Sequence, residues 1–245
     1  KRKNHAFRMY ARALADETGR WEAFTFASHD NPHLSTEALA ELTGDMTDDA
    51  YRQEILAEFL ENDGAVFRNI GNCMGAPNSV SRGEHSNHTL IGGIDWGKQA
   101  DYTAISIGCL TCKEEVYRDR FNKIDYAFQA QRLASIHKEW KVKRYLAESN
   151  AMGEPIIEQL QRLGIPVKPF ATTAQSKPQL IENLSLTLER EEWQFQNDPI
   201  WRSELEAYER TVSPNTGRSS YNAPSGLNDE TVIARALMVR QATQG

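Results

Sequence analysis

The fold is decided by the stretch Leu90-Ile91-Gly92-Gly93-Ile94-Asp95-Trp96-Gly97. It is a short apolar run that ends in a carboxylate, which predicts a buried strand. Two segments with alternating apolar residues follow at 102–110 and 115–121, and Thr111-Cys112-Lys113 supplies a turn between them. Three strands joined by short connections predict an antiparallel meander.

Beyond this meander the pattern alternates between helices and strands. Helical spacing, caps and closing glycines predict helices over 127–140, 155–163, 176–190, 200–210 and 228–241. Short apolar runs predict strands over 144–148 and 165–170, with a strand-like segment at 193–195. This order predicts an α/β fold, in which a mixed β-sheet is flanked by helices.

The residues before the sheet have a different composition. Residues 1–70 are polar, with a helix starting at Ser35 and a helical stripe over 48–60 that Gly64 ends. Residues 71–89 are rich in Gly, Ser and Asn, which predicts a flexible linker. We therefore expect a helical N-terminal segment over 1–70, a linker over 71–89 and one large domain over 90–245.

Composition excludes several classes of protein. With 40% hydrophobic and 25% charged residues, the 245-residue chain resembles an ordinary soluble globular protein. No apolar run approaches the roughly 20 residues of a membrane helix, so we expect no membrane partner. The net charge of −6 argues against coating nucleic acid through bulk charge, although a local basic groove stays open. Three cysteines cannot form a disulfide scaffold, which favours a reducing compartment.

Acidic residues stand at the ends of three predicted elements. Asp95 ends the first strand, Glu148 ends the fourth, and Asp229 and Glu230 open the last helix. Each could be an ordinary capping acid, and acids in a first helical turn are favoured by the helix dipole. Brought together, however, they would repel one another unless cations bound between them, and oxygen ligands suit Mg²⁺ or Mn²⁺.

The combination of these motifs resembles one known family, the nuclease part of the large terminase subunit of tailed phages, which has a ribonuclease H-like fold. The first matching segment is Gly92–Gly97 with Asp101–Ala104, the second is Ala147–Asn150 with Gly153, and the third is Gly226–Glu230. In the third, relatives often have His where Asn228 stands and Asp where Glu230 stands. Upstream, Asp30-Asn31-Pro32 and 51–59 resemble the segment that leaves the family's ATPase domain.

The resemblance implies a metal-dependent DNA endonuclease that cuts concatemeric phage DNA at packaging initiation and termination. Asp95, Glu148 and Asp229 would be catalytic and would hold two Mg²⁺ or Mn²⁺ ions, because paired ions can clamp the attacking and leaving oxygens of a phosphodiester. Asp101 and Glu230 would be auxiliary ligands, or residues that orient metal-bound water.

The resemblance also implies a setting. We expect double-stranded DNA, the terminase ATPase domain, the small terminase subunit and the portal protein as partners, in the host cytoplasm and transiently at the portal. The chain starts at Lys1 without Met, so we expect a fragment, in which residues 1–70 are the end of the ATPase module. It contains no Gly-x-x-x-x-Gly-Lys-Ser/Thr loop, so we expect no ATPase activity. Two alternatives stay open: a structure-selective resolvase on the same fold, and a non-catalytic module that docks on DNA or portal.

Basic residues near these motifs are candidate DNA contacts. Lys98 follows the first Asp and is the foremost candidate; Lys177 and Arg218 are weaker. For Lys177 we favour a solvent-facing side chain, because most surface lysines are of that kind. The turn-rich residues 213–224 predict a hairpin or flap beside the third acidic position, or an ordinary loop.

Cysteine and histidine spacing raises the alternative of zinc. Cys109-x-x-Cys112 could combine with Cys73 and His85-x-x-His88, and structural zinc needs four closed ligands. Cys109 falls in a strand that faces the core and Cys112 in a turn, and a buried cysteine commonly acts as a small hydrophobe. We therefore expect no zinc.

Overall fold

The computed structural model describes residues 5–59, 66–97, 101–150, 153–212 and 219–242. The chain divides into two compact units, residues 1–64 and 65–245. In its described residues, the first contains three short helices and one 3-10 turn: α1 (His5–Leu14), η1 (Ser28–Asp30), α2 (Thr36–Thr43) and α3 (Asp48–Glu54).

The helices expected in the first unit form, with one difference in length. The Ser35 side chain accepts a hydrogen bond from the backbone N–H of Ala38, which caps α2 as predicted. The predicted helix over 48–60 ends at Glu54, because Ala57 has a φ of 56° and a left-handed residue cannot continue a right-handed helix. The predicted stop at Gly64 lies outside the described residues.

The second unit is built on a five-stranded sheet. Its strands are β1 (Leu90–Asp95), β2 (Tyr102–Cys109), β3 (Glu114–Asn122), β4 (Arg144–Glu148) and β5 (Val167–Phe170), in the order β3-β2-β1-β4-β5. β1, β2 and β3 pair antiparallel, whereas β4 runs parallel to β1 and β5 parallel to β4. The predicted meander and mixed sheet are therefore confirmed.

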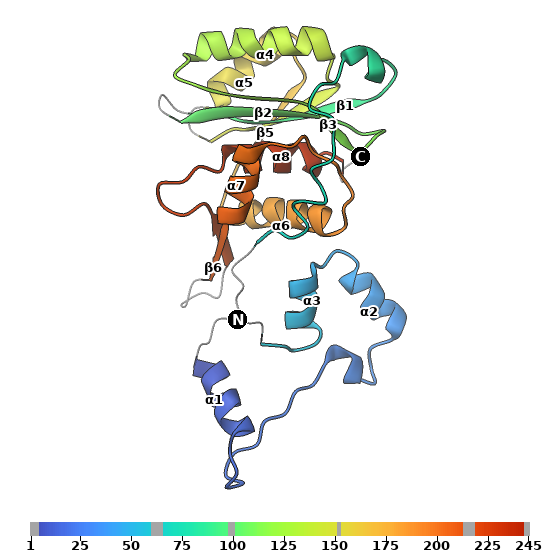
Figure 1. Cartoon of the computed structure of the whole chain (residues 1–245), viewed down its shortest axis with the longest axis vertical. Helices are drawn as coiled ribbons and strands as arrows, with labels where there is room; N and C mark the ends of the chain where they lie inside the picture. Colours follow the sequence, from blue (N-terminus) through green and yellow to red (C-terminus); the bar gives the residue numbers. More distant parts are fainter. Residues whose placement is uncertain (1–4, 60–65, 98–100, 151–152, 213–218, 243–245) are drawn as a thin grey trace. The chain divides into compact units, whose positions relative to one another are not determined.

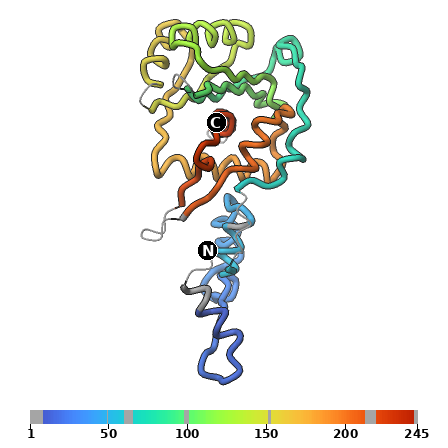
Figure 2. Tube along the Cα trace, turned by 60° about the vertical axis from the view of Figure 1, so that its left-hand side comes forward, coloured from blue at the N-terminus to red at the C-terminus, as the bar shows by residue number. Residues whose placement is uncertain are grey.

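Helices cover both faces of the sheet (Figure 1). One face carries α4 (Tyr126–Trp140) and α5 (Gly153–Arg162); the other carries α6 (Ser176–Glu189), α7 (Pro199–Ala207) and α8 (Glu230–Arg240). The turned view shows α8 enclosed between the sheet and the layer of α6 and α7 (Figure 2). Among the described helices, none has the length and apolar character needed to cross a membrane.

The last helix, α8, is buried on all sides, and β1 lies directly on it. Every residue from Glu230 to Val239 is buried, so the charged members Glu230 and Arg235 need partners inside the domain. A Cβ atom at Gly93 would lie 1.9 Å from the carbonyl oxygen of Ala234, so this close approach requires glycine. Glu230 lies one helical turn before Ala234, and the start of α8 therefore comes close to the end of β1 at Asp95.

A buried ion network fixes the orientation of α8. Arg235 is 2% exposed, and its Nη2 atom donates to Oε2 of Glu115 over 3.2 Å and to Oδ2 of Asp198 over 3.1 Å. Its guanidinium also lies over the Trp201 ring, 4.4 Å from the centroid. A buried cation needs such partners, because its charge is costly to bury alone. Since Glu115 is in β3 and Asp198 precedes α7, the network joins α8 to β3 and to the start of α7.

The segment predicted to be a flexible linker packs against the sheet domain. Cys73 is fully buried and its thiol contacts the Leu188 carbonyl at 3.4 Å, while the backbone N–H of Ala76 donates to Phe195 over 3.1 Å. A 3-10 turn, η2 (Arg82–His85), follows. Residues 71–89 therefore belong to the second compact unit, which begins after residue 64. The assignment of residues 1–70 to an ATPase module stays a prediction.

Two other segments differ from the prediction. Residues 193–195 form no strand; isolated bridges join Glu114 to Gln194 and Ala76 to Gln196. The helix expected to reach 210 ends at Ala207, because the chain enters the hairpin formed by β6 (Glu209–Val212) and β7 (Ser219–Asn222). The hairpin interpretation of 213–224 is thus confirmed, although residues 213–218 lie outside the described part.

Candidate active site

Two carboxylates meet where neighbouring parallel strands end. Ile94 of β1 pairs with Ala147 of β4, so Asp95 and Glu148 follow side by side at the same edge of the sheet. Their side chains are joined by a hydrogen bond. The Oε1 atom of Glu148 also accepts from Nδ2 of Asn150 over 3.2 Å, and Nδ2 of Asn150 donates to the carbonyl of Thr172 over 2.8 Å. The amide of Asn150 therefore orients Glu148.

The third carboxylate comes from the start of α8. Asp229 occupies the N-cap position, but its side chain makes no capping hydrogen bond. Its Oδ2 atom instead accepts from Nζ of Lys177 and from the hydroxyl of Tyr208, each over 3.1 Å. The side chain of Asp229 keeps 29% of its surface exposed. Asp229 is therefore directed toward Lys177 and Tyr208 and not toward the N–H groups of its own helix.

The environment of Asp95 shows that these acids act on one another. Asp95 is 8% exposed. Burial raises its pKa well above the usual range, and the hydrogen bond to Glu148 and the charges of Glu148, Asp229 and Glu230 raise it further. Clustered carboxylates repel one another, and a cation bound between them would relieve that repulsion. The charges of Glu148 and Asp229 thus both act on Asp95, and the role of the three acids as metal ligands stays a prediction.

Glu230 is paired with the guanidinium of Arg120. Its Oε1 atom accepts from Nε of Arg120 over 2.8 Å and pairs with Nη2 at 2.5 Å. The Arg120 guanidinium lies 3.4 Å from the centroid of the Tyr102 ring. The Glu230 side chain is only 9% exposed, so its charge is balanced largely by Arg120.

The first turn of α8 is capped by an acid that the sequence did not suggest. Glu204 of α7 accepts from the backbone N–H of Thr231 over 3.1 Å and from the Thr231 hydroxyl. Burial raises the pKa of Glu204 to about 7, with the charge of Glu230 contributing and the hydrogen bonds from Thr231 opposing. Glu204 thus supplies the cap that Asp229 does not make.

The predicted basic residues have different outcomes. Lys98 and Arg218 lie outside the described residues. The solvent-facing interpretation of Lys177 is wrong: its side chain is 21% exposed and its Nζ donates to Asn222 Oδ1 as well as to Asp229, each over 3.1 Å. Asp101 is exposed, directly before β2. The charges that raise the pKa of Asp95 most are those of Glu148, Asp229 and Glu230, and not that of Asp101.

A cavity of about 360 Å³ lies beside Lys177. Its lining comes from the start of α6, the loop before it and strand β7: Thr172, Thr173, Ala174, Lys177, Pro178, Ser219, Ser220, Tyr221 and Asn222. Hydroxyl groups and one ammonium are the polar groups that commonly contact the sugar–phosphate backbone of nucleic acids. No carboxylate lines it among the described residues.

Comparisons with known proteins show what this chain is similar to. The chain is 28% identical over 200 residues to the terminase large subunit of Thermus virus P23-45, and 28% identical over 205 residues to that of Thermus phage G20c. Each alignment covers 78% of this chain and 41% of the relative. This chain is a homologue of phage terminase large subunits. It spans about two fifths of the length of those relatives, and no protein-family model matches it.

Solved terminase structures share its fold. The large terminase nuclease of phage G20c with bound magnesium aligns with a TM-score of 0.66 at 24% identity, covering 74% of this chain and 99% of that one. The large terminase of bacteriophage HK97 aligns with a TM-score of 0.57 at 11% identity, covering 95% of this chain and 60% of that one. The G20c nuclease also has structures with cobalt and with zinc, and the Sf6 nuclease domain has one with manganese. The predicted ribonuclease H-like terminase fold is thus confirmed.

The terminase motifs pointed to the acids but not to their partners. Tyr208 is 1% exposed, follows α7 directly, and has no motif or spacing that links it to Asp229. Asn150 did stand inside the second terminase segment, so its position there was the one available signal. Arg120 lies on β3 opposite Ala104. The alternation of side chains along a strand predicts which face of the sheet Arg120 occupies, but not its pairing with Glu230.

The positions behind the expectation of no zinc are confirmed, but they do not keep the candidate ligands apart. Cys109 does lie in the buried end of β2 and Cys112 in the following turn, as predicted. Their sulfur atoms nevertheless lie within 4.8 Å of ligand atoms of His85 and His88. Cys73 is elsewhere, buried against Leu188. This second group of donors is separate from the terminase carboxylates.

Proposed function

We propose that this chain is a divalent-metal-dependent endodeoxyribonuclease, the nuclease part of a phage DNA-packaging terminase, which cuts concatemeric viral DNA at the start and at the end of packaging. The observation that carries the proposal is the pair Asp95 and Glu148, side by side at one edge of the sheet, with the charge of Asp229 acting on Asp95. Similarity to terminase large subunits supports it.

The residues fit a hard divalent metal. All three offer carboxylate oxygens, which are the ligands that Mg²⁺ and Mn²⁺ prefer, and the neighbouring acids that raise the pKa of Asp95 would be offset by a bound cation. Asp95, Glu148 and Asp229 would hold two such ions. Bound there, the ions would supply an activated water and would stabilise charge on the phosphate. The G20c and Sf6 nuclease structures with magnesium and manganese agree with this choice of metal.

The chain's own groups position the acids and the substrate. Asn150 holds Glu148, and Tyr208 together with Lys177 holds Asp229. Lys177 also faces the cavity lined by hydroxyl groups, where it would contact a phosphate next to the scissile bond. Backbone contacts carry no sequence code, so cleavage should be nearly independent of sequence. Lys98 and Arg218 remain proposed DNA contacts, and Asp101 a proposed auxiliary residue.

The biological setting is also a proposal. The chain would act on double-stranded DNA next to the terminase ATPase domain, with the small terminase subunit and the portal protein as partners. Its location would be the host cytoplasm, and transiently the portal. Because the 245 residues contain no phosphate-cradling Gly-rich loop with Lys-Ser/Thr, they should not hydrolyse ATP by themselves.

Cleavage of supercoiled plasmid by the purified chain tests the proposal. We expect nicked and then linear DNA with Mn²⁺ or Mg²⁺, and intact plasmid with EDTA. Ca²⁺ should not replace them, because its longer and looser coordination does not suit a two-metal displacement. Full cleavage in EDTA, or no cleavage in Mn²⁺ by folded protein, would reject it.

Two further measurements separate this proposal from its alternatives, the structure-selective resolvase and the docking module. A resolvase would cut a four-way junction much faster than a linear duplex of the same sequence, whereas the terminase nuclease should cut both at similar rates. A docking module would cut neither and would have no reason to bind Mn²⁺ at the carboxylates. Calorimetric titration with Mn²⁺ therefore distinguishes an inactive docking module from a slow enzyme.

A further inference from the structure

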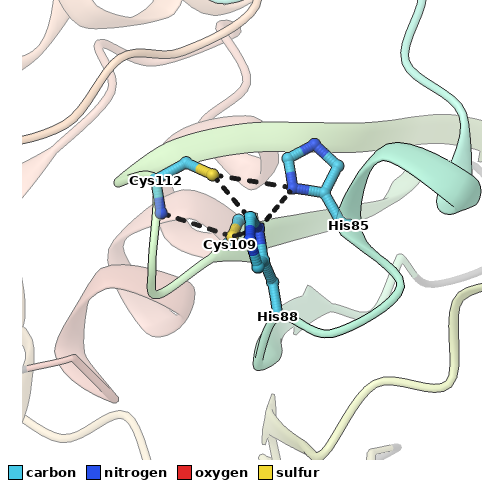
Figure 3. Close-up of side chains that lie close together, drawn as sticks. All are labelled: His85, His88, Cys109 and Cys112. Atoms are coloured by element: carbon cyan, nitrogen blue, oxygen red, sulfur yellow. Dashed lines mark hydrogen bonds between the residues drawn. The ribbon is translucent and has the colours of Figure 1, made fainter.

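A second group of metal-binding side chains lies away from the carboxylates. His85, His88, Cys109 and Cys112 point toward one another (Figure 3). The histidines come from the segment before β1, Cys109 from the end of β2 and Cys112 from the turn that follows. One nitrogen or sulfur atom from each lies within 4.8 Å of all the others. Two imidazoles and two thiols are a common donor set for structural zinc.

The distances within the group match the edges of a tetrahedron. The two Nδ1 atoms of His85 and His88 lie 3.3 Å apart. Nδ1 of His88 lies 3.5 Å from Sγ of Cys109 and 3.3 Å from Sγ of Cys112, and Nδ1 of His85 lies 3.7 Å from Sγ of Cys112. Zinc bonds of about 2.0 Å to nitrogen and about 2.3 Å to sulfur give tetrahedral edges of roughly 3.3 Å between nitrogens and roughly 3.6 Å between nitrogen and sulfur.

Local structure holds each donor in place. The Arg82 side chain donates to the His85 carbonyl, and the backbone N–H of His88 donates to the same oxygen over 3.0 Å. Cys109 is held by the pairing of β2 with both neighbouring strands. The backbone N–H of Cys112 donates to Sγ of Cys109 over 3.4 Å, which ties the turn to the end of β2.

Ordinary packing does not explain this group. Cys109 is fully buried, and alone would pass as a small apolar residue, but Cys112 is exposed. His85 is 6% exposed, and its Nδ1 faces His88 and a thiol. A buried imidazole without a metal usually has a carbonyl or carboxylate partner, since an unmatched polar group is costly to bury. Four soft donors facing one point suggest that a cation belongs there.

We propose that His85, His88, Cys109 and Cys112 bind one Zn²⁺ ion in a closed structural site. Thiolate and imidazole ligands select zinc, whereas carboxylates suit Mg²⁺ and Mn²⁺. Four protein ligands leave no open position for water or substrate, which marks a structural and not a catalytic site. The ion would join the segment that leads into β1 to the β2–β3 turn.

The two metal sites would be independent. Cys109 pairs with Leu90 at the start of β1, whereas Asp95 ends β1. Five residue steps of about 3.3 Å separate those ends by roughly 17 Å. The zinc proposal therefore does not rest on the proposed nuclease function, and either can fail without the other.

Metal content of the purified chain tests the site. The chain should be expressed with zinc, purified without chelator and freed of any histidine tag, and its metals measured by plasma mass spectrometry. We expect about one zinc per chain in the native protein and in the matched controls Cys73→Ala and Asp95→Asn. His88→Ala and Cys112→Ser should contain almost none. Cys73→Ala removes a thiol outside the group, and Asp95→Asn alters the acidic site alone.

Cobalt substitution adds a spectroscopic signature. Replacing zinc by Co²⁺ should produce the intense visible bands of tetrahedral cobalt and a near-ultraviolet thiolate-to-cobalt band, which Cys112→Ser should weaken. In the native protein, Cys109 and Cys112 should react with a thiol reagent only after a zinc chelator is added. The chelator should also lower the melting temperature of the native chain by several degrees and leave that of Cys112→Ser unchanged.

Three results would overturn the proposal. One is metal-free protein in which both thiols react at once. Another is a disulfide between Cys109 and Cys112 in protein purified under reducing conditions. The third is zinc that disappears in Asp95→Asn but persists in Cys112→Ser, because that ion would be at the acidic site. Plasmid cleavage with Mn²⁺ by Cys112→Ser, measured below the melting temperature of this variant, shows whether the nuclease works without zinc. The zinc proposal and the nuclease proposal are therefore tested separately.

Discussion

Nζ of Lys177 lies 3.1 Å from Oδ2 of Asp229, so the first turn of α6 places a cation against one of the three clustered acids. In the metal-free protein this ammonium offsets part of the repulsion around Asp229. When a divalent ion binds, the same ammonium becomes a like charge beside it. Lys177 should therefore weaken metal binding while it assists the substrate.

Lys177→Met is expected to separate these two effects. Removing one unit charge at this range is worth roughly 1 kcal/mol, so the half-saturating Mn²⁺ concentration should fall about fivefold. The cleavage rate at saturating Mn²⁺ should fall about tenfold, because a charged contact to phosphate of about 1.5 kcal/mol is lost. Rates across a Mn²⁺ titration measure both. Lys168→Met is the matched control, because Lys168 is an exposed lysine on β5. If the two variants behave alike, the proposed role of Lys177 beside the metal and the phosphate is wrong.

The raised pKa of Asp95 predicts how stability depends on pH. The native state holds the Asp95 proton to higher pH than the unfolded chain does, so this group's contribution to stability is present below about pH 4 and is lost as pH rises through the native pKa. Asp95→Asn does not titrate. In EDTA, the variant should melt a few degrees higher than the native chain at pH 7, and the gap should narrow toward pH 4. A gap that widens on acidification would contradict this explanation.

Glu230→Gln should affect stability more than metal binding. Its carboxylate is paired with Arg120, so the change removes a charged hydrogen bond worth about 2 kcal/mol but no metal ligand. Urea unfolding should show that loss, while calorimetry should give the same number of Mn²⁺ ions per chain as in the native protein. A lower stoichiometry would make Glu230 a ligand.

Gly93→Ala should disrupt the packing of α8 on β1. The new Cβ would lie 1.9 Å from the Ala234 carbonyl and 2.5 Å from the backbone nitrogen of Met238, and backbone cannot move aside as a side chain can. A loss of about 3 kcal/mol or more is expected by urea unfolding. Gly83→Ala is the matched control, because the nearest atom there is 3.6 Å away. Equal stability of the two variants would show that α8 can shift freely.

The sheet and its acids could be predicted because the determining signals are local. An apolar run that ends in a carboxylate identifies a strand and its final residue, and β4 has the predicted bounds Arg144–Glu148. Once β1 and β4 are parallel neighbours, Asp95 and Glu148 must meet. The shortening of α3 was not predictable, because nothing in an apolar helical stripe indicates the left-handed Ala57.

The partners of the acids could not be predicted because they depend on distant contacts. Lys177 and Asp229 are 52 positions apart, and only the packing of α6 on α8 joins them. The spacings His85-x-x-His88 and Cys109-x-x-Cys112 can be seen in the sequence. The two pairs come together, however, only if η2 lies against the β2–β3 turn. That arrangement follows from the tertiary fold and not from either motif.

The central claim is that Asp95 makes the acidic cluster a metal-dependent nuclease site, and plasmid cleavage at saturating Mn²⁺ by Asp95→Asn tests it most directly. The account predicts that this variant, folded and with a melting temperature in EDTA no lower than that of the native chain, cuts at least about a thousandfold more slowly, a loss of roughly 4 kcal/mol in transition-state stabilisation. Glu158→Gln, which alters an exposed carboxylate on α5, should cut at the native rate. Native cleavage by Asp95→Asn would contradict the account.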